Sequence, residues 1–315
     1  MTWAASSALA PAGPQAARLA HLTWVFIVVC AIVYLVVLVA LAIAIGGRRS
    51  TAVDERRRLR VVLAGAGVTA LVLVALLIAT VATGHGLNPM RGAHDVLTAR
   101  VIGRQWWWEI QYPGAAPDQQ VSTANELHIP VGRPVLLELV SRDVIHSFWV
   151  PALHGKRDLI PGHDSTVYIQ ADRPGVFRGQ CAEFCGAQHA KMGVLVIAEE
   201  PAQFEAWLAN QRRPAAPAAE LAGVEARRGQ ELFLNGTCPM CHTVAGTRAA
   251  ATQGPDLTHV AARATLGAGS LANVREHLER WIADAQAFKP GSEMPPTPLP
   301  AADLSALLAY LETLR

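Results

Sequence analysis

The chain has 315 residues, of which 51% are hydrophobic and 17% are charged, and its formal net charge is +2. Soluble domains average about 25% charged residues, so the composition argues against a uniformly soluble globule, and the apolar content excludes a fully disordered chain. The small net charge gives no indication of a nucleic-acid partner. There are five cysteines and five methionines, and the odd, tightly spaced cysteines argue against a disulfide scaffold.

Two long uncharged runs lie near the N-terminus, at residues 22–45 and 61–81. As a helix, each is long enough to cross a bilayer core of about 30 Å. The first run exceeds the apolar stretch of about 7–15 residues in a signal peptide, and no clear cleavage site follows it. The loop between the runs is rich in arginine, which predicts that it is cytoplasmic. Its arginines are Arg48, Arg49, Arg56, Arg57, Arg58 and Arg60. We therefore expect a multi-pass hairpin in the cytoplasmic (plasma) membrane, with both termini and the C-terminal bulk on the periplasmic or extracytoplasmic side.

The next part of the chain reads as a strand-rich domain. Short β-branched or apolar segments at 134–140, 165–170 and 192–197 are separated by Gly/Pro turns, a pattern typical of an antiparallel sandwich. Residues 201–211 predict a short helix, and the Pro/Ala stretch at 212–220 predicts a linker that is semi-rigid at most.

The remainder of the chain changes to helical spacing. Residues 224–234, 272–285 and 301–314 each predict a helix. These segments indicate a small all-α domain at the C-terminus.

Residues 181–192 hold two thiols, an imidazole and a thioether: Cys181, Cys185, His189 and Met192. His146 is a further candidate ligand upstream. Soft sulfur with imidazole favours copper or zinc. A disulfide would leave the histidine and methionine without a role, and zinc would leave the methionine spare. The set is large enough for two coppers that share both thiolates, which is the interpretation we favour.

Residues 173–192 closely resemble the binuclear copper (CuA) loop of cytochrome c oxidase subunit II. The resemblance extends to 141–151, 160–162 and 105–108 and to the N-terminal hairpin, and it covers most of residues 20–200. It implies a cupredoxin-like β-sandwich that carries two copper ions.

The resemblance also implies the roles of single residues. Cys181 and Cys185 would bridge the two coppers, His146 and His189 would each bind one, and Met192 would be a weak axial ligand. Glu183 would bind copper through its backbone carbonyl. Its carboxylate would reach a Mg²⁺ or Mn²⁺ shared with the catalytic subunit, which suits a hard cation.

Two further positions are less determined by the resemblance. Trp106 would be the residue through which electrons reach the copper, although three adjacent tryptophans leave the register open and an interfacial aromatic belt is the alternative. In the family, a carboxylate near the second membrane helix serves proton uptake. Glu55 is a candidate for that role, and a solvated loop charge is the other interpretation.

A second motif, Cys238-Pro-Met-Cys241-His242, is the attachment signature of a covalent haem c, with His242 as the proximal ligand. A thioredoxin-like redox pair would need a βαβ context, whereas these flanks are helical. The preceding residues 229–233 fit the first helix of a class I cytochrome c.

A sixth ligand for the haem iron is then needed, and methionine or histidine is usual. Met294 is the only methionine downstream, and its loop resembles the axial-methionine loop of cytochromes c. His259 and His277 are the alternatives. Residues 254–257 resemble the segment that packs beside the proximal histidine, with Pro255 as the expected contact.

The whole arrangement resembles subunit II of a caa3-type cytochrome c oxidase. The expected architecture is a membrane-anchored multidomain chain: residues 1–83 with a two-helix transmembrane hairpin, a cupredoxin-like CuA domain at 84–211, a linker at 212–222 and a cytochrome c domain at 223–315. The linker would raise the effective concentration of haem at copper to about millimolar, so that weak docking suffices.

The implied enzyme is a respiratory cytochrome c oxidase, in which this chain would accept electrons and pass them to a catalytic subunit I that reduces O₂ to water coupled to proton translocation. Other oxidase subunits, the membrane, and an upstream cytochrome or bc1-type reductase are the expected partners, with no nucleic acid. Two alternatives are the copper-bearing subunit of a nitric-oxide reductase and a membrane copper chaperone or storage protein. The haem motif counts against the chaperone.

Overall fold

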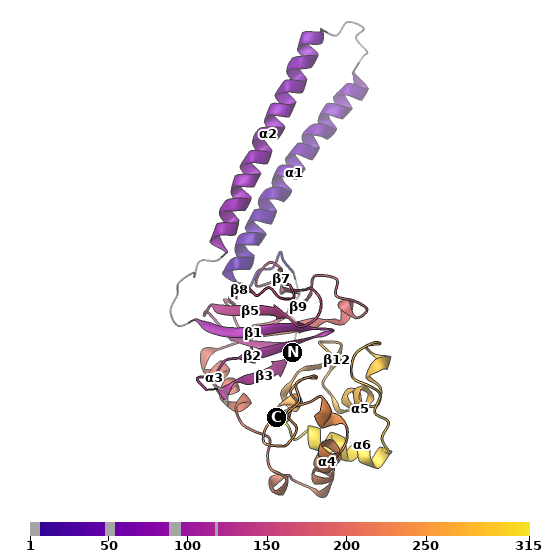
Figure 1. The fold of residues 1–315 in the computed structure, drawn as a ribbon. Coiled ribbons are helices and arrows are strands. Elements are labelled where there is room, and N and C mark those ends of the chain that lie inside the picture. The colour runs from indigo at the N-terminus through magenta and orange to yellow at the C-terminus, as the bar shows by residue number, and fades with distance from the viewer. Residues whose placement is uncertain (1–6, 48–53, 88–95, 117–118) are drawn as a thin grey trace.

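The computed structural model describes residues 7–47, 54–87, 96–116 and 119–315. Two long helices extend from one end of a β-sandwich, and a small helical module lies at the other end (Figure 1). Arg48 and Arg49 of the predicted cytoplasmic loop lie outside the described residues.

The two long helices are α1 (Pro14–Gly46) and α2 (Glu55–Gly86). Their most apolar windows have mean hydropathies of 3.3 and 2.8, and none of either window is buried within the chain. Apolar segments of this length that are not buried within the chain suit the hydrocarbon core of a membrane. Glu55 is the exposed first residue of α2, directly after the N-cap residue Asp54.

The start of α1 is attached to the sandwich. The amide of Ala12 donates to the carbonyl of Ala152 at 2.7 Å, and the amide of Ala16 donates to the carbonyl of Leu153 at 3.2 Å. These contacts fix the direction in which the hairpin leaves the sandwich.

The sandwich consists of two five-stranded sheets. One has the order β3-β2-β1-β5-β8 and the other β4-β10-β9-β6-β7. The strands of the first sheet are β1 (Leu97–Arg104), β2 (Trp107–Tyr112), β3 (Val121–Ala124), β5 (Val135–Ser141) and β8 (Ser165–Ile169). Those of the second are β4 (Glu126–Pro130), β6 (His146–Trp149), β7 (Arg157–Leu159), β9 (Gly175–Cys181) and β10 (Gly193–Glu199).

The prediction of an antiparallel sandwich was only partly right. β1 pairs with β5, and β4 with β10, in parallel, whereas the other pairs within the two sheets are antiparallel. Both parallel pairs join strands that are not consecutive in the chain, and a parallel neighbour requires a long crossover connection rather than a hairpin. Local turn signals could not reveal these pairings.

The core of the sandwich lies between the two sheets. Along β5 the side chains alternate between buried and half-buried, as expected where one face of a strand covers a core. Large side chains such as Trp108, Tyr112 and Phe177 are at most 1% exposed. The helix α3 (Pro201–Gln211) closes one end, with Phe204 buried and Trp207 stacked on His128.

The helical module contains α4 (Val224–Asn235), α5 (Arg275–Ala283) and α6 (Ala301–Leu311), with a two-stranded ribbon of β11 (Thr265–Leu266) and β12 (Leu271–Ala272). α4 crosses α6 at Gly229, where a Cβ would lie 1.9 Å from the carbonyl oxygen of Ala306. Only glycine permits this close approach. Phe233 and Tyr310 pack beside the crossing, with ring centroids 5.8 Å apart.

The Pro/Ala stretch lies along the helical module. The amide of Ala215 donates to the carbonyl of Ala245 at 2.9 Å, residues 218–220 form a short 3-10 turn, and Leu221 is buried in the core of the module. This part of the linker, for which the composition predicted at most a semi-rigid segment, is therefore packed against the helical module.

Candidate metal centre and haem attachment site

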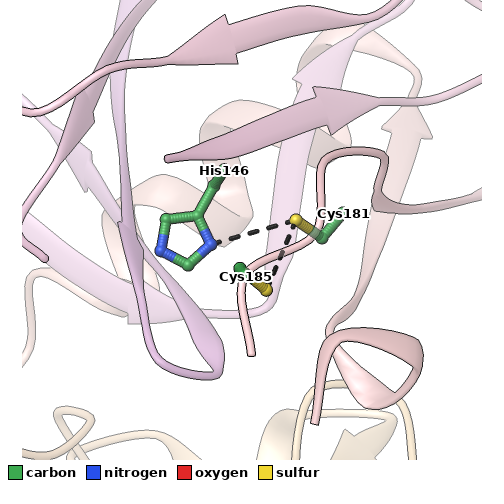
Figure 2. Close-up of side chains that lie close together, drawn as sticks. All are labelled: His146, Cys181 and Cys185. Atoms are coloured by element: carbon green, nitrogen blue, oxygen red, sulfur yellow. Dashed lines mark hydrogen bonds between the residues drawn. The ribbon is translucent and has the colours of Figure 1, made fainter. Parts of the chain in front are cut away.

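The two thiols of the sulfur-rich loop face each other at one end of the sandwich. Cys181 is the last residue of β9, and Cys185 lies in the loop that returns to β10. Their sulfurs are 3.8 Å apart, far longer than the disulfide bond of about 2.05 Å. His146, the first residue of β6, points its Nδ1 at the Cys181 sulfur from 3.9 Å (Figure 2). These three side chains are buried and form a cluster able to hold a metal.

The other predicted ligands lie around the same two sulfurs. The Nδ1 of His189 is 3.6 Å from the Cys185 sulfur, and the Met192 sulfur is 3.8 Å from it. The backbone carbonyl oxygen of Glu183 is 3.2 Å from the Cys181 sulfur. The structure thus brings together all six residues that were predicted as copper ligands.

The local fold explains this convergence. His146 lies 35 residues before Cys181, but β6 pairs with β9 so that Phe148 is opposite Cys181. The loop after Cys181 is short and ends in the 3-10 turn η2 (His189–Lys191), after which the amide of Cys181 bonds to the carbonyl of Met192 at 2.9 Å. The adjacent ends of β6 and β9, together with the loop between β9 and β10, therefore present every candidate ligand at one end of one sheet.

The cluster favours thiolate. The contact between the two sulfurs lowers the pKa of Cys181 to about 3 and raises the pKa of Cys185. The Cys181 thiolate accepts a hydrogen bond from the Cys185 thiol, and a second negative charge beside it is disfavoured. A thiolate is the form of cysteine that binds metals. Cys181 is therefore prepared to bind a soft cation as a thiolate, whereas Cys185 has to release its proton when the metal binds.

Asp143 orients His146, a role that the sequence analysis missed. Its carboxylate oxygen lies 2.7 Å from Nε2 of His146, which leaves Nδ1 free to face the sulfurs. Burial alone would lower the pKa of His146, but the contacts with Asp143 and Cys181 outweigh burial and raise it. Metal-binding histidines commonly donate their second nitrogen to a carboxylate in this way. The sequence signal that could have identified Asp143 was an acidic residue three positions before a candidate histidine ligand.

The donor set fits copper. Two thiolates, two imidazoles and a buried thioether are soft or borderline ligands, which suit copper and are poor partners for hard cations. Met192 is fully buried against Cys185, where a thioether serves copper better than zinc.

The side-chain carboxylate of Glu183 lies away from the thiols, whereas its backbone carbonyl faces the Cys181 sulfur. It forms an ion pair with Lys156 at 3.1 Å, and both side chains are substantially exposed. Asp158 lies 4.0 Å from the same ammonium. The carboxylate is thus on the surface, next to a second acidic group.

The three adjacent tryptophans occupy different places. Trp108 is completely buried in the sandwich core, and Trp107 lies under the guanidinium of Arg104. Trp106 is half-buried, and its Nε1–H donates to the carbonyl of Cys185 at 2.9 Å. Among the three, Trp106 therefore has a direct hydrogen bond to a candidate copper ligand.

The haem attachment motif lies in the helical module. Cys238 begins the 3-10 turn η4 (Cys238–Met240), with two residues between it and the end of α4, and both Cys238 and Cys241 are free, half-buried thiols. The Nδ1 of His242 faces the carbonyl of Pro255 at 2.8 Å, which confirms the predicted contact. Its Nε2 is then left as the atom for an iron ligand.

A cavity of about 540 Å³ adjoins this motif. It includes Cys238 and is lined on its apolar side by Leu232, Leu299 and Leu307. Cys238 is the one residue of the motif that lines the cavity, and the wall also holds polar side chains such as Arg228 and Glu231.

The loop that carries Met294 is held by Gln286, a second residue that the sequence analysis missed. The amide group of Gln286 donates to the carbonyls of Ser292 and Met294, both at 2.7 Å, and its oxygen accepts from the amide of Gly291 at 2.7 Å. The alternative ligand His259 has both ring nitrogens against backbone carbonyls. The other alternative, His277, faces the carbonyl of Ala272. These contacts count against His259, both of whose ring nitrogens are engaged, and Met294 stays the predicted ligand over His277.

Comparisons with known proteins match two separate parts of the chain to two families. A family profile described as cytochrome c oxidase subunit II, periplasmic domain, matches residues 115–199, and one described as cytochrome c matches residues 226–315. The cytochrome c oxidase subunit 2 of Alkalihalophilus pseudofirmus is 36% identical, over 98% of this chain and 91% of the relative. That of Bacillus sp. strain PS3 is 30% identical, over 78% of this chain and 71% of the relative. The periplasmic domain of subunit II of a cytochrome oxidase of Bradyrhizobium japonicum is 30% identical, over 37% of this chain and 93% of that domain, with a TM-score of 0.35.

Proposed function

The chain belongs to the cytochrome c oxidase subunit II family, and on that premise we propose that it passes electrons from a covalent haem c through a binuclear CuA centre to the catalytic subunit of a haem-copper oxidase. The catalytic subunit then reduces O₂ to water, coupled to proton translocation. The chain carries a cytochrome c domain fused to the copper domain, as in caa3-type oxidases. The observation that supports the proposal best is that two imidazoles, a thioether and a backbone carbonyl converge on two free thiols.

The bound groups supply reversible one-electron chemistry, and the residues of this chain hold them in place. Cys181 and Cys185 would hold two copper ions through their thiolates, and His146 and His189 would each bind one. Met192 and the carbonyl of Glu183 complete the set. Asp143 keeps Nδ1 of His146 turned toward the sulfurs, and burial of the thiols excludes water from the centre.

In the cytochrome c domain, Cys238 and Cys241 form the thioether bonds to haem. His242 binds the iron through Nε2, because the carbonyl of Pro255 holds Nδ1. Met294 would be the second protein ligand of the iron, and a methionine ligand raises the haem potential relative to histidine. Trp106 connects the two centres, since its indole bonds to the carbonyl of Cys185.

The two apolar helices anchor the chain in the cytoplasmic membrane. We propose that both cross it, with the termini and the redox domains on the outer side. The proposed boundaries are 1–83 for the N-terminal segment and hairpin, 84–211 for the copper domain, 212–222 for the linker and 223–315 for the cytochrome. An upstream cytochrome or bc1-type reductase is the proposed electron donor.

Subunit I and other oxidase subunits complete the enzyme. We propose that the Glu183 carboxylate shares a Mg²⁺ or Mn²⁺ with subunit I, because it is exposed on the surface close to Asp158. An oxygen-rich surface site suits such a hard cation. The names of the relatives, which are oxidase subunits, favour oxygen over nitric oxide as the terminal substrate.

Metal analysis of the purified oxidase tests the proposal. We expect about two coppers in this chain, the number that two shared thiolates support, and one covalent haem c. Cys181→Ser should abolish the near-infrared absorption of the copper pair and leave the haem spectrum intact. Cys30→Ser, which changes an exposed cysteine of α1, is the matched control and should change neither.

A copper-to-chain ratio near one, or zinc in place of copper, would contradict the binuclear assignment. Persistence of the near-infrared band in Cys181→Ser would do so as well. Loss of the band in Cys30→Ser would show that it does not report on the proposed ligands.

A further inference from the structure

The helical module with the haem attachment motif, called the cytochrome module below, rests directly on the β-sandwich with α3, called the copper module. Lys289 lies at the interface between the two modules. Its side chain is buried, with 3% of the residue exposed. The ammonium donates to the carbonyls of Trp106 at 2.6 Å, Lys191 at 2.9 Å and Gly267 at 3.2 Å. A lysine ammonium has three donors, so all three are used. Two of the three acceptors belong to the copper module.

Glu126 makes the reciprocal contact from the copper module. It lies on β4, is 3% exposed, and accepts hydrogen bonds from the backbone amides of Ala264 and Thr265, both at 2.9 Å. The hydroxyl of Thr265 adds a bond of 3.3 Å. A buried carboxylate of one module thus binds backbone donors of the other.

Further contacts lie between these two anchors. The amide of Gly193 donates to the carbonyl of Ala268 at 3.0 Å, and the side-chain amide of Gln188 donates to the carbonyl of Pro290 at 2.9 Å. The Lys191 ammonium bonds to the carbonyl of Phe288. A Cβ on Gly291 would lie 3.7 Å from the indole of Trp106. The loop that carries Met294 therefore lies against Trp106.

Opposite charges placed in this way specify one docked position. A charge that leaves water must find hydrogen-bond partners in the new environment. Here the partners of the buried ammonium and the buried carboxylate are largely backbone groups of the opposite module, which are fixed by its fold. A shift of the cytochrome module by one residue along β4 or across Trp106 would leave the Lys289 ammonium and the Glu126 carboxylate buried without these hydrogen-bond partners.

We propose that Lys289 and Glu126 form a two-point latch that holds the cytochrome module in one fixed position on the copper module, with Lys289 as the positioning residue for the Met294 loop over Trp106. The latch replaces the weak, transient docking expected of a tethered donor. This inference rests on the proposed electron transfer from haem to copper.

A buried latch and a mobile tether differ in their response to salt. Exposed charges more than a Debye length apart are screened, and this length falls from about 30 Å at 0.01 M to about 3 Å at 1 M. Contacts between buried groups are screened much less. A latched cytochrome should therefore deliver electrons to copper at a rate that does not depend on ionic strength.

The test uses the complete oxidase with Lys289→Met or Glu126→Gln in this chain. The first readout is hydrogen exchange at the amides of Ala264 and Thr265, which Lys289 does not contact. In Lys289→Met we expect these amides to exchange at least about tenfold faster, because loss of one buried charged partner weakens the whole interface. The second readout is the rate of electron transfer from photoreduced haem c to copper, at low and high salt.

We expect a rate independent of salt in the unmodified oxidase. In both variants the rate should be at least about tenfold slower, as expected when one partner of a buried charged contact is removed, and should become dependent on salt and viscosity. Arg212→Met and Glu225→Gln remove exposed charges of the same signs and are the matched controls. Near-infrared and haem spectra should stay unchanged in all four proteins.

Three outcomes decide between the possibilities. Unchanged exchange and an unchanged rate in both variants overturn the latch and leave the proposed function standing. A salt-dependent rate in the unmodified oxidase also overturns it, because the donor would then be mobile. If haem never reduces copper even in the unmodified oxidase, the proposed function itself fails.

Discussion

The indole N–H of Trp106 donates to the backbone carbonyl of Cys185 at 2.9 Å, and the side-chain amide of Gln105 donates to the same oxygen at 2.7 Å. The approach is possible because Gly186 follows Cys185. Gly186 has a φ of +113°, and a Cβ there would lie 2.9 Å from the Gln105 amide nitrogen. The backbone of the copper loop is thus hydrogen-bonded to Trp106, the residue that faces the cytochrome module.

Trp106→Phe should slow electron transfer from haem c to copper, because it removes the hydrogen bond to Cys185 while it keeps an aromatic ring. Such a bond contributes about 0.5–1.5 kcal/mol net, so the fold should persist. Flash photolysis of the reduced oxidase measures the rate. Trp107→Phe is the control, since Trp107 lies under Arg104; an equal effect in the two variants would refute the specific role of Trp106.

Asp143→Asn should weaken copper binding about 10–100-fold, the usual effect of removing the carboxylate behind a metal-binding histidine. The amide lacks the negative charge that favours Nε2–H of His146 and hence Nδ1 as the ligand atom. Release of copper to a chelator, followed by the near-infrared band, measures the change. Asp164→Asn, at an exposed position of the same module, should release copper at the unmodified rate.

Met294→Ala should remove the thioether ligand and lower the haem potential, because a methionine ligand raises it. Optical spectra of the oxidised and reduced haem should lose the signature of a low-spin, methionine-bound iron. Met240→Ala is the control, since Met240 is 74% exposed within the attachment loop. A haem spectrum that is unchanged in Met294→Ala would exclude Met294 as the ligand.

Gly229→Ala should destabilise the cytochrome module at the crossing of α4 and α6. The added methyl would meet the Ala306 carbonyl oxygen at 1.9 Å, and overpacking commonly costs about 1–3 kcal/mol. Thermal unfolding followed at the haem absorption, together with the yield of covalent haem, measures the effect. Glu225→Ala, on the exposed side of α4, should leave both values close to those of the unmodified chain; the same loss there would show a general intolerance of α4.

Several features of this protein could be predicted from the sequence, because they depend on local spacing. The membrane helices follow from two uncharged runs, and α3 begins and ends at the residues predicted for it. The loop from Cys181 to Met192 and the Cys238–His242 motif bring chemically matched groups close together within a few residues. Such short segments are constrained by their covalent connection, so their composition already indicates their chemistry.

Other features were decided only by the tertiary structure. The parallel pairing of β1 with β5 and the approach of His146 to Cys181 depend on which distant strands become neighbours. The distinction between Trp106 and its two neighbours follows from the direction each side chain takes in the folded sheet. The bond of Lys289 to Trp106 and those of Glu126 to Ala264 and Thr265 join residues more than one hundred positions apart. Contacts of that kind arise from packing of whole modules and from the need to satisfy buried charge, which no local pattern in the sequence records.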